Sequence, residues 1–291
     1  MIRAVRSELI KVRTTNTWWL MALGVFAFTA LALLFNALNA HFELAHAETP
    51  REMPAEQREQ WAHDEEMRYT EAHTAAALAR TAANLYTSGQ FFGVMLIMIL
   101  GALIVTNEYF HQTATATFLT TPRRTTVIMA KLVTGVILGF GAWAITTTTS
   151  VAAGTIFLGT EHVPHMLGEW TVLQSILLNL GAFAMWAVLG IALGTLIRSQ
   201  IAAVVTGTTV YLIGIGVASL VFNLVRAFLI KEDWVITAQV IVPAVASQIM
   251  VTPGEAFPHA APQWVGAAVL CGYALVAGVI GTLLTRRRDI S

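Results

Sequence analysis

The 291-residue chain contains a single cysteine, Cys271, and only three lysines. One cysteine excludes a disulfide framework within the chain and a metal site built on several thiolates. Lys11, Lys131 and Lys231 are followed by Val, Leu and Glu. A phosphate-binding loop of the form G-x-x-x-x-G-K-[ST] needs Ser or Thr at that position, so none of the three can belong to one. Energy for any work done by this chain therefore has to come from an ion gradient or from another polypeptide.

Charge is also scarce. Charged residues make up 12% of the chain and hydrophobic residues 56%, with a mean hydropathy of +0.66. A soluble domain has about 25% charged residues. The formal net charge is zero, so the surplus of cations needed to bind nucleic acid is missing. The sequence contains neither an H-E-x-x-H zinc motif nor a G-x-S-x-G nucleophile motif, and nothing else in it indicates an enzyme.

Six apolar segments are long enough to cross a bilayer, which takes about 20 residues at about 1.5 Å per residue. They cover residues 18–40, 89–106, 127–158, 171–197, 201–222 and 264–285. The first follows several cations but is longer than the apolar core of a signal peptide, about 7–15 residues, so we interpret it as an uncleaved span. We therefore predict an all-α integral membrane protein with six transmembrane helices in a single domain, residues 1–291.

The N-terminal residues 1–17 predict an amphipathic elbow helix along the membrane surface, followed by Trp18 and Trp19 as interfacial anchors. Apolar residues recur there at helical spacing: Ile2, Val5, Leu9 and Val12. Residues 41–88 are polar, and we expect one or two helices in that loop. Residues 223–263 are apolar but interrupted by prolines. Because the run 234–242 is too short to span, it favours a re-entrant or interfacial helix.

The distribution of cations predicts the orientation. With both termini in the cytoplasm, as six spans allow, eleven of the 17 Lys and Arg residues and three of the 17 acids lie inside. The positive-inside rule favours this direction. We expect a multi-pass protein of the plasma membrane, with residues 41–88 and 223–263 outside and residues 107–124 inside.

The segment between the second and third spans has the most specific pattern. It reads TNEYFHQTATATFLTTPRR over residues 106–124, with an acid at the span boundary, a threonine-rich stretch, and a proline before paired arginines. The N-terminal SELIKVRTT, residues 7–15, precedes Trp18 and Trp19. Together these segments resemble the permease subunit of type-2 ABC exporters, in the compact form common in high-GC Gram-positive bacteria. The resemblance covers the whole chain, although members often have Gly-Thr where this chain has Gln112-Thr113.

The resemblance implies a cytoplasmic coupling helix over about residues 107–121 that docks on a separate ATP-binding cassette subunit. The residues it assigns to the coupling segment are Glu108, Tyr109, Phe110, His111, Gln112, Thr113, Arg123 and Arg124. ATP and Mg²⁺ would be bound by that partner, so no cofactor is expected in this chain. It also implies pairing with a second copy or a related permease. A solvated connector is the alternative interpretation of residues 107–121.

Polar residues inside spans are candidate positions on a substrate pathway. They are Thr146, Thr147 and Thr149 in the third span and Gln174 and Asn179 in the fourth. Threonine can return its hydroxyl group to its own helix backbone, which is the alternative interpretation for the first three. Gln174 and Asn179 should face a neighbouring helix or a cavity.

The favoured function is export of a hydrophobic or amphipathic substrate, powered by the separate ATP-binding subunit. An ion-coupled carrier is an alternative, weakened because the spans have almost no charge at their centres. A sensor or scaffold whose residues 41–88 bind an extracellular ligand is another. His162 and His165 form an incomplete ligand set, so no metal site is predicted.

Overall fold

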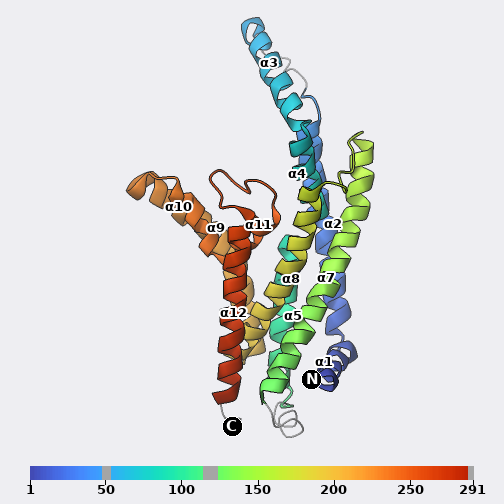
Figure 1. The fold of residues 1–291 in the computed structure, drawn as a ribbon, viewed down its shortest axis with the longest axis vertical. Helices are drawn as coiled ribbons and strands as arrows, with labels where there is room; N and C mark the ends of the chain where they lie inside the picture. Colours follow the sequence, from blue (N-terminus) through green and yellow to red (C-terminus); the bar gives the residue numbers. More distant parts are fainter. Residues whose placement is uncertain (48–53, 114–123, 288–291) are drawn as a thin grey trace.

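Six apolar helices long enough to cross a membrane dominate the computed structural model, which describes residues 1–47, 54–113 and 124–287 (Figure 1). They are α2 (Thr17–Leu44), α5 (Gln90–Phe110), α7 (Arg124–Thr160), α8 (Trp170–Leu196), α9 (Gln200–Val225) and α12 (Gln263–Arg287). Over the described ranges the chain contains helices and no strand. The predicted all-α class is confirmed, and so are six helices long and apolar enough to span a membrane, with ends that differ from the predicted ones by at most four residues.

The N-terminus and the end of α12 lie at the same end of the bundle, which we call the base, and α3 (Ala55–Ala72) lies at the opposite end, the tip (Figure 1). Residues 41–88 contain the last turn of α2, then α3 and α4 (Ala75–Tyr86), so the expected pair of helices is present. A short helix, α1 (Ile2–Thr14), lies at the base.

A bent pair of helices follows α9. A π-helical turn, η1 (Arg226–Ile230), leads to α10 (Trp234–Thr237), the 3-10 helix η2 (Ala238–Ile241) and α11 (Pro243–Val251). The axis turns by 105° between Ile241 and Pro243. Pro243 is the first residue of α11, a position whose N–H would have no helical partner in any residue. Its ring also prevents the preceding helix from continuing through it. Counted as one span, this pair would be a seventh crossing.

Helices α5 and α8 form the centre of the bundle because glycine lets their backbones approach. A Cβ atom at Gly190 would lie 2.0 Å from the carbonyl oxygen of Met98, and one at Gly194 would lie 2.7 Å from that of Ala102. On α7, a Cβ at Gly139 would lie 3.0 Å from the carbonyl oxygen of Phe183. The glycine pairs of two G-x-x-x-G patterns, 135–139 and 190–194, therefore pack helices against each other within one chain.

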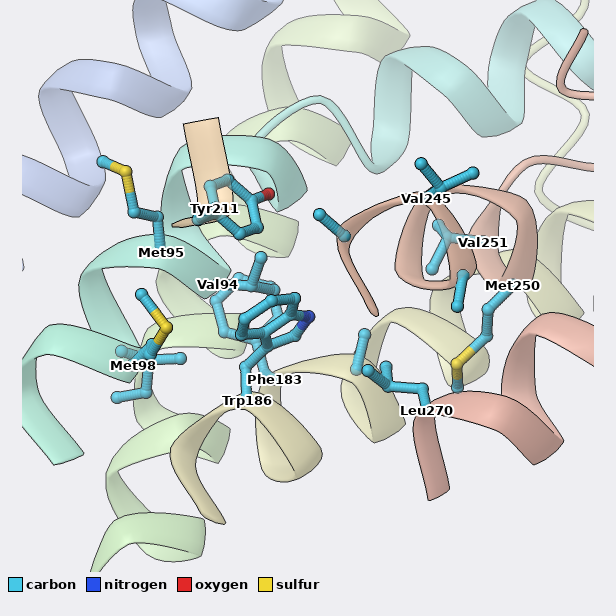
Figure 2. Packing of buried hydrophobic residues seen from close by; sticks show 14 of the residues in the cluster. Val94, Met95, Met98, Phe183, Trp186, Tyr211, Val245, Met250, Val251 and Leu270 are labelled. Atoms are coloured by element: carbon cyan, nitrogen blue, oxygen red, sulfur yellow. The ribbon is translucent and has the colours of Figure 1, made fainter. Parts of the chain in front are cut away.

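The largest cluster of buried apolar side chains lies where α5, α8, α9, α11 and α12 meet (Figure 2). The rings of Trp186 and Tyr211 meet edge to face, with centroids 5.0 Å apart, a favoured arrangement for aromatic pairs. The Tyr211 hydroxyl group donates to the carbonyl oxygen of Phe91 at 2.8 Å. By contrast, α9 exposes most of its apolar side chains, including Ile201 and Val210. Such a surface is compatible with a multi-pass membrane protein, whose outer face contacts lipid.

Gly190→Ala should destabilise the fold, because the new methyl group would force α5 and α8 apart. Overpacking of this kind costs about 1–3 kcal/mol. Gly141→Ala is the matched control: it lies on α7, a Cβ there has no neighbour within 4 Å, and alanine favours the helix by up to about 1 kcal/mol. The thermal unfolding midpoint of the purified protein should fall for the first variant and stay level or rise for the second. Equal midpoints would contradict the packing described here.

At the tip, Arg68 of α3 caps the end of α2. Its guanidinium group donates to the carbonyl oxygens of Glu43 at 2.9 Å and Ala45 at 2.6 Å, at a helix end where carbonyl groups lack helical partners. The Glu65 carboxylate accepts bonds of 2.6 and 2.8 Å from the same guanidinium group and one of 2.7 Å from the Ala47 N–H. These hydrogen bonds lower the pKa of Glu65 from 4.5 to about 2, and those from Arg68 have the largest effect.

The cap should be sensitive to acid. Because the pKa of Glu65 is lowered on folding, its contribution is complete above about pH 4.5 and is lost as the pH falls towards 2. Arg68→Ala should return the pKa of Glu65 most of the way to 4.5, leaving the Ala47 bond. A ¹³C-NMR titration of the Glu65 carboxyl, assigned with Glu65→Gln, measures this. Arg226→Ala removes an exposed cation elsewhere and should leave the titration of Glu65 unchanged. If the Glu65 titration curve is the same in the wild type and in Arg68→Ala, Arg68 is not the cause of the lowered pKa.

Candidate functional site

Four charged side chains from three helices meet at the base of the bundle. Glu8 and Lys11 lie one turn apart on α1, and Glu8 is the buried residue of that helix. Glu108 lies in the last turn of α5, and Lys131 lies about two turns into α7. These helices are brought together although Glu8 and Lys131 are 123 positions apart in the sequence. We call this group, Glu8, Lys11, Glu108 and Lys131, the charge cluster.

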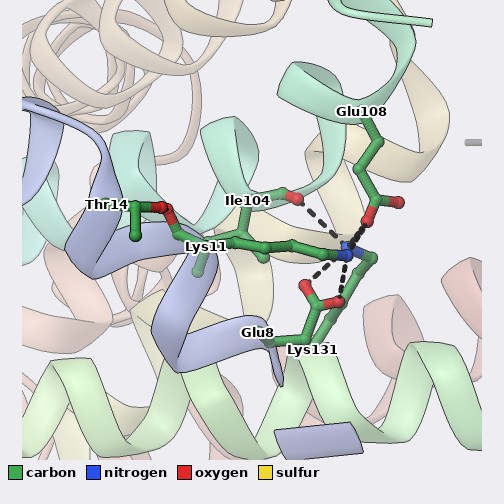
Figure 3. A network of polar contacts seen from close by, with 6 residues as sticks. All are labelled: Glu8, Lys11, Thr14, Ile104, Glu108 and Lys131. Atoms are coloured by element: carbon green, nitrogen blue, oxygen red, sulfur yellow. Dashed lines mark hydrogen bonds and ion pairs between the residues drawn. The ribbon is translucent and has the colours of Figure 1, made fainter. Parts of the chain in front are cut away.

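Each ammonium group of the charge cluster contacts both carboxylates (Figure 3). The Lys131 Nζ atom lies 2.8 Å from Glu8 Oε2 and 2.9 Å from Glu108 Oε1. The Lys11 Nζ atom lies 2.7 Å from Glu8 Oε1 and 2.5 Å from Glu108 Oε1. Lys131 also donates to the carbonyl oxygen of Ile104 at 3.2 Å. The cluster thus brings two cations and two anions into mutual contact.

Pairing is obligatory for most of this cluster because three of its members are buried. The side chains of Lys131, Glu8 and Glu108 are 4%, 6% and 8% exposed. A buried ion without its partner is unfavourable by several kcal/mol. Lys11 is more open, and its pKa lies above 10.5: burial alone would lower it, but the hydrogen bonds to Glu108 and Glu8 outweigh that effect. Its contribution to folding is therefore complete at neutral pH and is lost only at higher pH.

A cavity of about 260 Å³ adjoins the charge cluster between α1, the start of α2 and the end of α5. Glu8, Lys11, Asn107, Glu108 and His111 line it together with apolar residues of α5. The cluster is therefore reachable from this cavity.

Helix α5 ends in a bonded turn directly after Glu108. The Thr113 N–H donates to the carbonyl oxygen of Glu108 at 2.9 Å and the Gln112 N–H to that of Tyr109 at 3.2 Å, the two bonds of a Schellman motif. Gln112 has a φ of 55°. This left-handed conformation favours glycine, so the Gln112-Thr113 departure from Gly-Thr occupies the position where glycine would be unstrained.

This turn corrects the expected coupling helix. Residues 107–110 are the last turn of α5, and the helix stops at His111, so no separate helix begins at 107. Residues 114–123, including Arg123, lie outside the described residues, and Arg124 is the first residue of α7. The sequence could not locate this boundary because the apolar run ends at Thr106, whereas the helix continues for one more turn.

The remaining residues of the segment have different surroundings. Phe110 is 68% exposed and lies edge to face with His111, with ring centroids 5.0 Å apart. The Tyr109 ring lies under the guanidinium group of Arg198, 5.2 Å from ring centroid to Cζ, within the range of a cation–π contact. His111, Gln112 and Thr113 are exposed. Glu108 therefore faces the bundle interior, while Phe110 presents an apolar ring at the base.

A family model described as "Protein of unknown function (DUF2705)" matches residues 61–291. The chain belongs to the DUF2705 family. The match includes Glu108 and Lys131 and begins after Glu8 and Lys11, so the charge cluster of this DUF2705 member joins the matched region to the helix that precedes it. A search of curated proteins finds no match.

The pathway residues predicted from the sequence do not gather at one place. Thr146 is buried and returns its hydroxyl group to the carbonyl oxygen of Trp143 at 2.9 Å, the local satisfaction open to threonine. Asn179 is buried, and its Oδ1 atom has no hydrogen-bond partner among the described residues. Thr147, Thr149 and Gln174 are partly buried. None of the five lines the cavity beside the charge cluster or the two cavities considered below.

No group of three or more His, Cys, Asp or Glu side chains capable of holding a metal ion occurs within residues 1–47, 54–113 and 124–287. His41 instead lies 2.8 Å from Glu161, a contact between α2 and the residue after α7. Sequence reasoning did not pair Glu8 with Lys131. The available signal was the pair of opposite charges at Glu8 and Lys11, one turn apart on an otherwise amphipathic helix.

Lys131→Met should destabilise the chain by about 3 kcal/mol, because it leaves Glu8 and Glu108 buried with Lys11 as their shared cation. Arg226→Met is the control. It breaks the Arg226–Asp233 pair, whose side chains are 42% and 52% exposed, and should cost less than about 1 kcal/mol. Thermal unfolding of both purified variants tests this. If the two midpoints fall equally, the buried cluster is not a major stabilising feature.

Proposed function

We propose that this chain is the membrane-spanning permease subunit of an ATP-driven exporter. Its base would face the cytoplasm and receive a separate ATP-binding subunit. The observation that carries the proposal is the charge cluster, which ties α1, α5 and α7 together and includes Glu108, directly before the turn at residues 111–113. The missing phosphate-binding loop requires the ATP-hydrolysing machinery to reside in a partner.

The charge cluster supports the proposal for a mechanical reason. A separate ATP-binding subunit can move this chain only through a contact that transmits force. Residues 107–113 are continuous with α5, and Lys131 holds α7 to Glu108 across a distance of 2.9 Å. A displacement of the segment would therefore move the ends of α5 and α7 together, and Glu8 would carry α1 with them. A loosely attached loop would absorb the same displacement.

Phe110 is the proposed contact with the ATP-binding subunit. An aromatic ring exposed at the base has no apolar environment of its own, and aromatic side chains contribute strongly when buried in a protein interface. Glu108 is excluded from that role because it is buried in the cluster. The coupling residues expected from the resemblance thus divide into a docking residue, Phe110, and a transmitting residue, Glu108.

The proposal also assigns a place in the membrane to α1 and to the bent pair. On α1, Ile2 and Ile10 are 86% and 51% exposed beside the cations of the same helix. A helix of this kind is suited to the cytoplasmic membrane surface as an elbow helix. The bent pair 234–251 would be a re-entrant element, since its halves are each too short to span. The positive-inside rule supports a plasma-membrane protein with both termini inside.

A functional transporter would contain two such chains, either identical or related. The apolar surface of α9, almost all of it unburied in the single chain, supports a packed neighbour as well as lipid contact.

The test is to purify the chain alone and together with an ATP-binding polypeptide encoded next to it. ATPase activity should require the ATP-binding polypeptide and respond to the permease. Phe110→Ala should weaken co-purification and lower permease-dependent ATPase activity about tenfold, as for loss of a central interface residue. Its unfolding midpoint should match the wild type, because the ring is exposed.

Phe42→Ala is the matched control, since Phe42 is equally exposed, at 67%, but lies near the tip end of α2. It should leave co-purification and ATPase activity unchanged. If both variants behave alike, or if purified chain transports a substrate without any ATP-hydrolysing subunit, the proposed function is wrong.

An ion-coupled carrier is the second candidate, favoured by the buried carboxylates next to the cavity at the base. Buried ionisable groups of membrane proteins commonly bind or relay ions. This function would require transport in vesicles that is driven by an imposed ion gradient in the absence of ATP, and that is lost in Glu108→Gln.

A further inference from the structure

A polar cavity of about 450 Å³ lies among α2, α4, α5, α9 and α11, and Tyr211 is one of its lining residues. Nine of its thirteen lining residues have polar side chains, and none is charged. Its volume falls within the range of about 300–1,000 Å³ typical of ligand pockets. We call it the polar cavity.

Hydrogen bonds fix two walls of the polar cavity. The Gln90 side-chain amide donates to the Ser247 carbonyl oxygen at 2.7 Å and to its Oγ at 3.1 Å, which ties α5 to α11. The Asn36 amide donates to Ser88 Oγ at 2.9 Å, which ties α2 to the α4–α5 junction. These bonds hold the cavity open without the help of a ligand.

Two further amides of the polar cavity remain available. Asn84 and Gln248 line it, both are exposed, and neither side chain has a hydrogen-bond partner among the described residues. Each offers donors and an acceptor. Uncharged donors and acceptors of this kind match hydroxyl or amide groups of a ligand.

An apolar cavity of about 290 Å³ is lined by Met98, Trp186, Leu193 and Val210 among others, and none of its lining residues is charged. Tyr211 and Ala244 line both cavities. A polar space and an apolar space therefore adjoin at these two residues, which suits a molecule with a polar head and an apolar chain.

We propose that the polar cavity binds the uncharged, hydrogen-bonding head group of an amphiphile, whose hydrocarbon chain occupies the apolar cavity. The inference concerns the cargo of the proposed exporter and rests on that function. Charged head groups are disfavoured, because none of the residues that line either cavity supplies a counter-charge. Both glycosides and amides have the required chemistry.

The test measures protection of a cysteine in the polar cavity. Thr252→Cys in a Cys271→Ser background places a thiol among the lining residues, and its rate of alkylation by a maleimide is followed in nanodiscs. Four probes with the same eight-carbon alkyl chain are compared: octyl glucoside, N-nonanoylglycinamide, octyltrimethylammonium and octyl sulfate. The first two distinguish a hydroxyl from an amide source.

At least one neutral probe should slow alkylation at concentrations about tenfold lower than either charged probe. Asn84→Leu combined with Gln248→Leu should raise the concentration needed by about fivefold to tenfold, the effect of losing hydrogen bonds to the head group. Asn223→Leu, on α9 but outside both cavities, should leave it unchanged. Gln248→Glu, of nearly the same shape, should shift the preference towards octyltrimethylammonium.

The inference is overturned if all four probes protect the cysteine equally, or if none of them protects it. It is also overturned if a charged probe protects best while Gln248 is unchanged. This assay uses the chain without an ATP-binding subunit, so it is independent of the coupling test. If ATPase activity depends on Phe110 while the cysteine is not protected, the cargo inference fails and the exporter function stands. If the cysteine is protected as expected but no ATP-binding subunit couples to the chain, the binding site stands and the exporter function fails.

Discussion

Neutralisation of buried charge at the base is the constraint on which the arrangement of α1, α5 and α7 depends. Removing Glu8, Glu108 or Lys131 alone would leave an unbalanced charge among the buried members of the cluster. Separating any one helix would expose or unpair at least one of them. The three helices are therefore linked more tightly at the base than their apolar contacts alone would require, and the linkage lies next to the residues proposed to receive the ATP-binding subunit.

Farther from the base, close backbone packing, and not ion pairing, holds the helices together. Gly190 and Gly194 bring α8 against α5, and Gly139 brings α7 against α8. Interfaces made by direct backbone contact leave little room for sliding, so these helices form a frame. Helix α9 has less of its apolar surface covered by the rest of the chain than α5 or α8.

The sequence was sufficient for the six spans because long apolar runs report bilayer-length helices directly. It also placed helices in residues 41–88 and a break near Pro243, since proline restricts the backbone locally. It could not identify the charge cluster, whose members Glu8 and Lys131 become neighbours only through helix packing. From the sequence, a coupling helix was expected to start at about residue 107, because the apolar run ends at Thr106. The structure shows that Glu108 to Phe110 still belong to α5.

Polar residues that are adjacent in the sequence and those that line the polar cavity occupy different parts of the fold. The threonines of α7 are adjacent in the sequence, and the Thr146 hydroxyl group donates to a carbonyl oxygen of its own helix. The amide side chains of the polar cavity come from four separate helices, and in the sequence nothing connects them. They are Asn36, Asn84, Gln90 and Gln248. Packing collects them around one cavity, and Tyr211 lines both that cavity and an apolar one. A ligand that is polar at one end and apolar at the other then follows from the juxtaposition of the two spaces, not from any single motif.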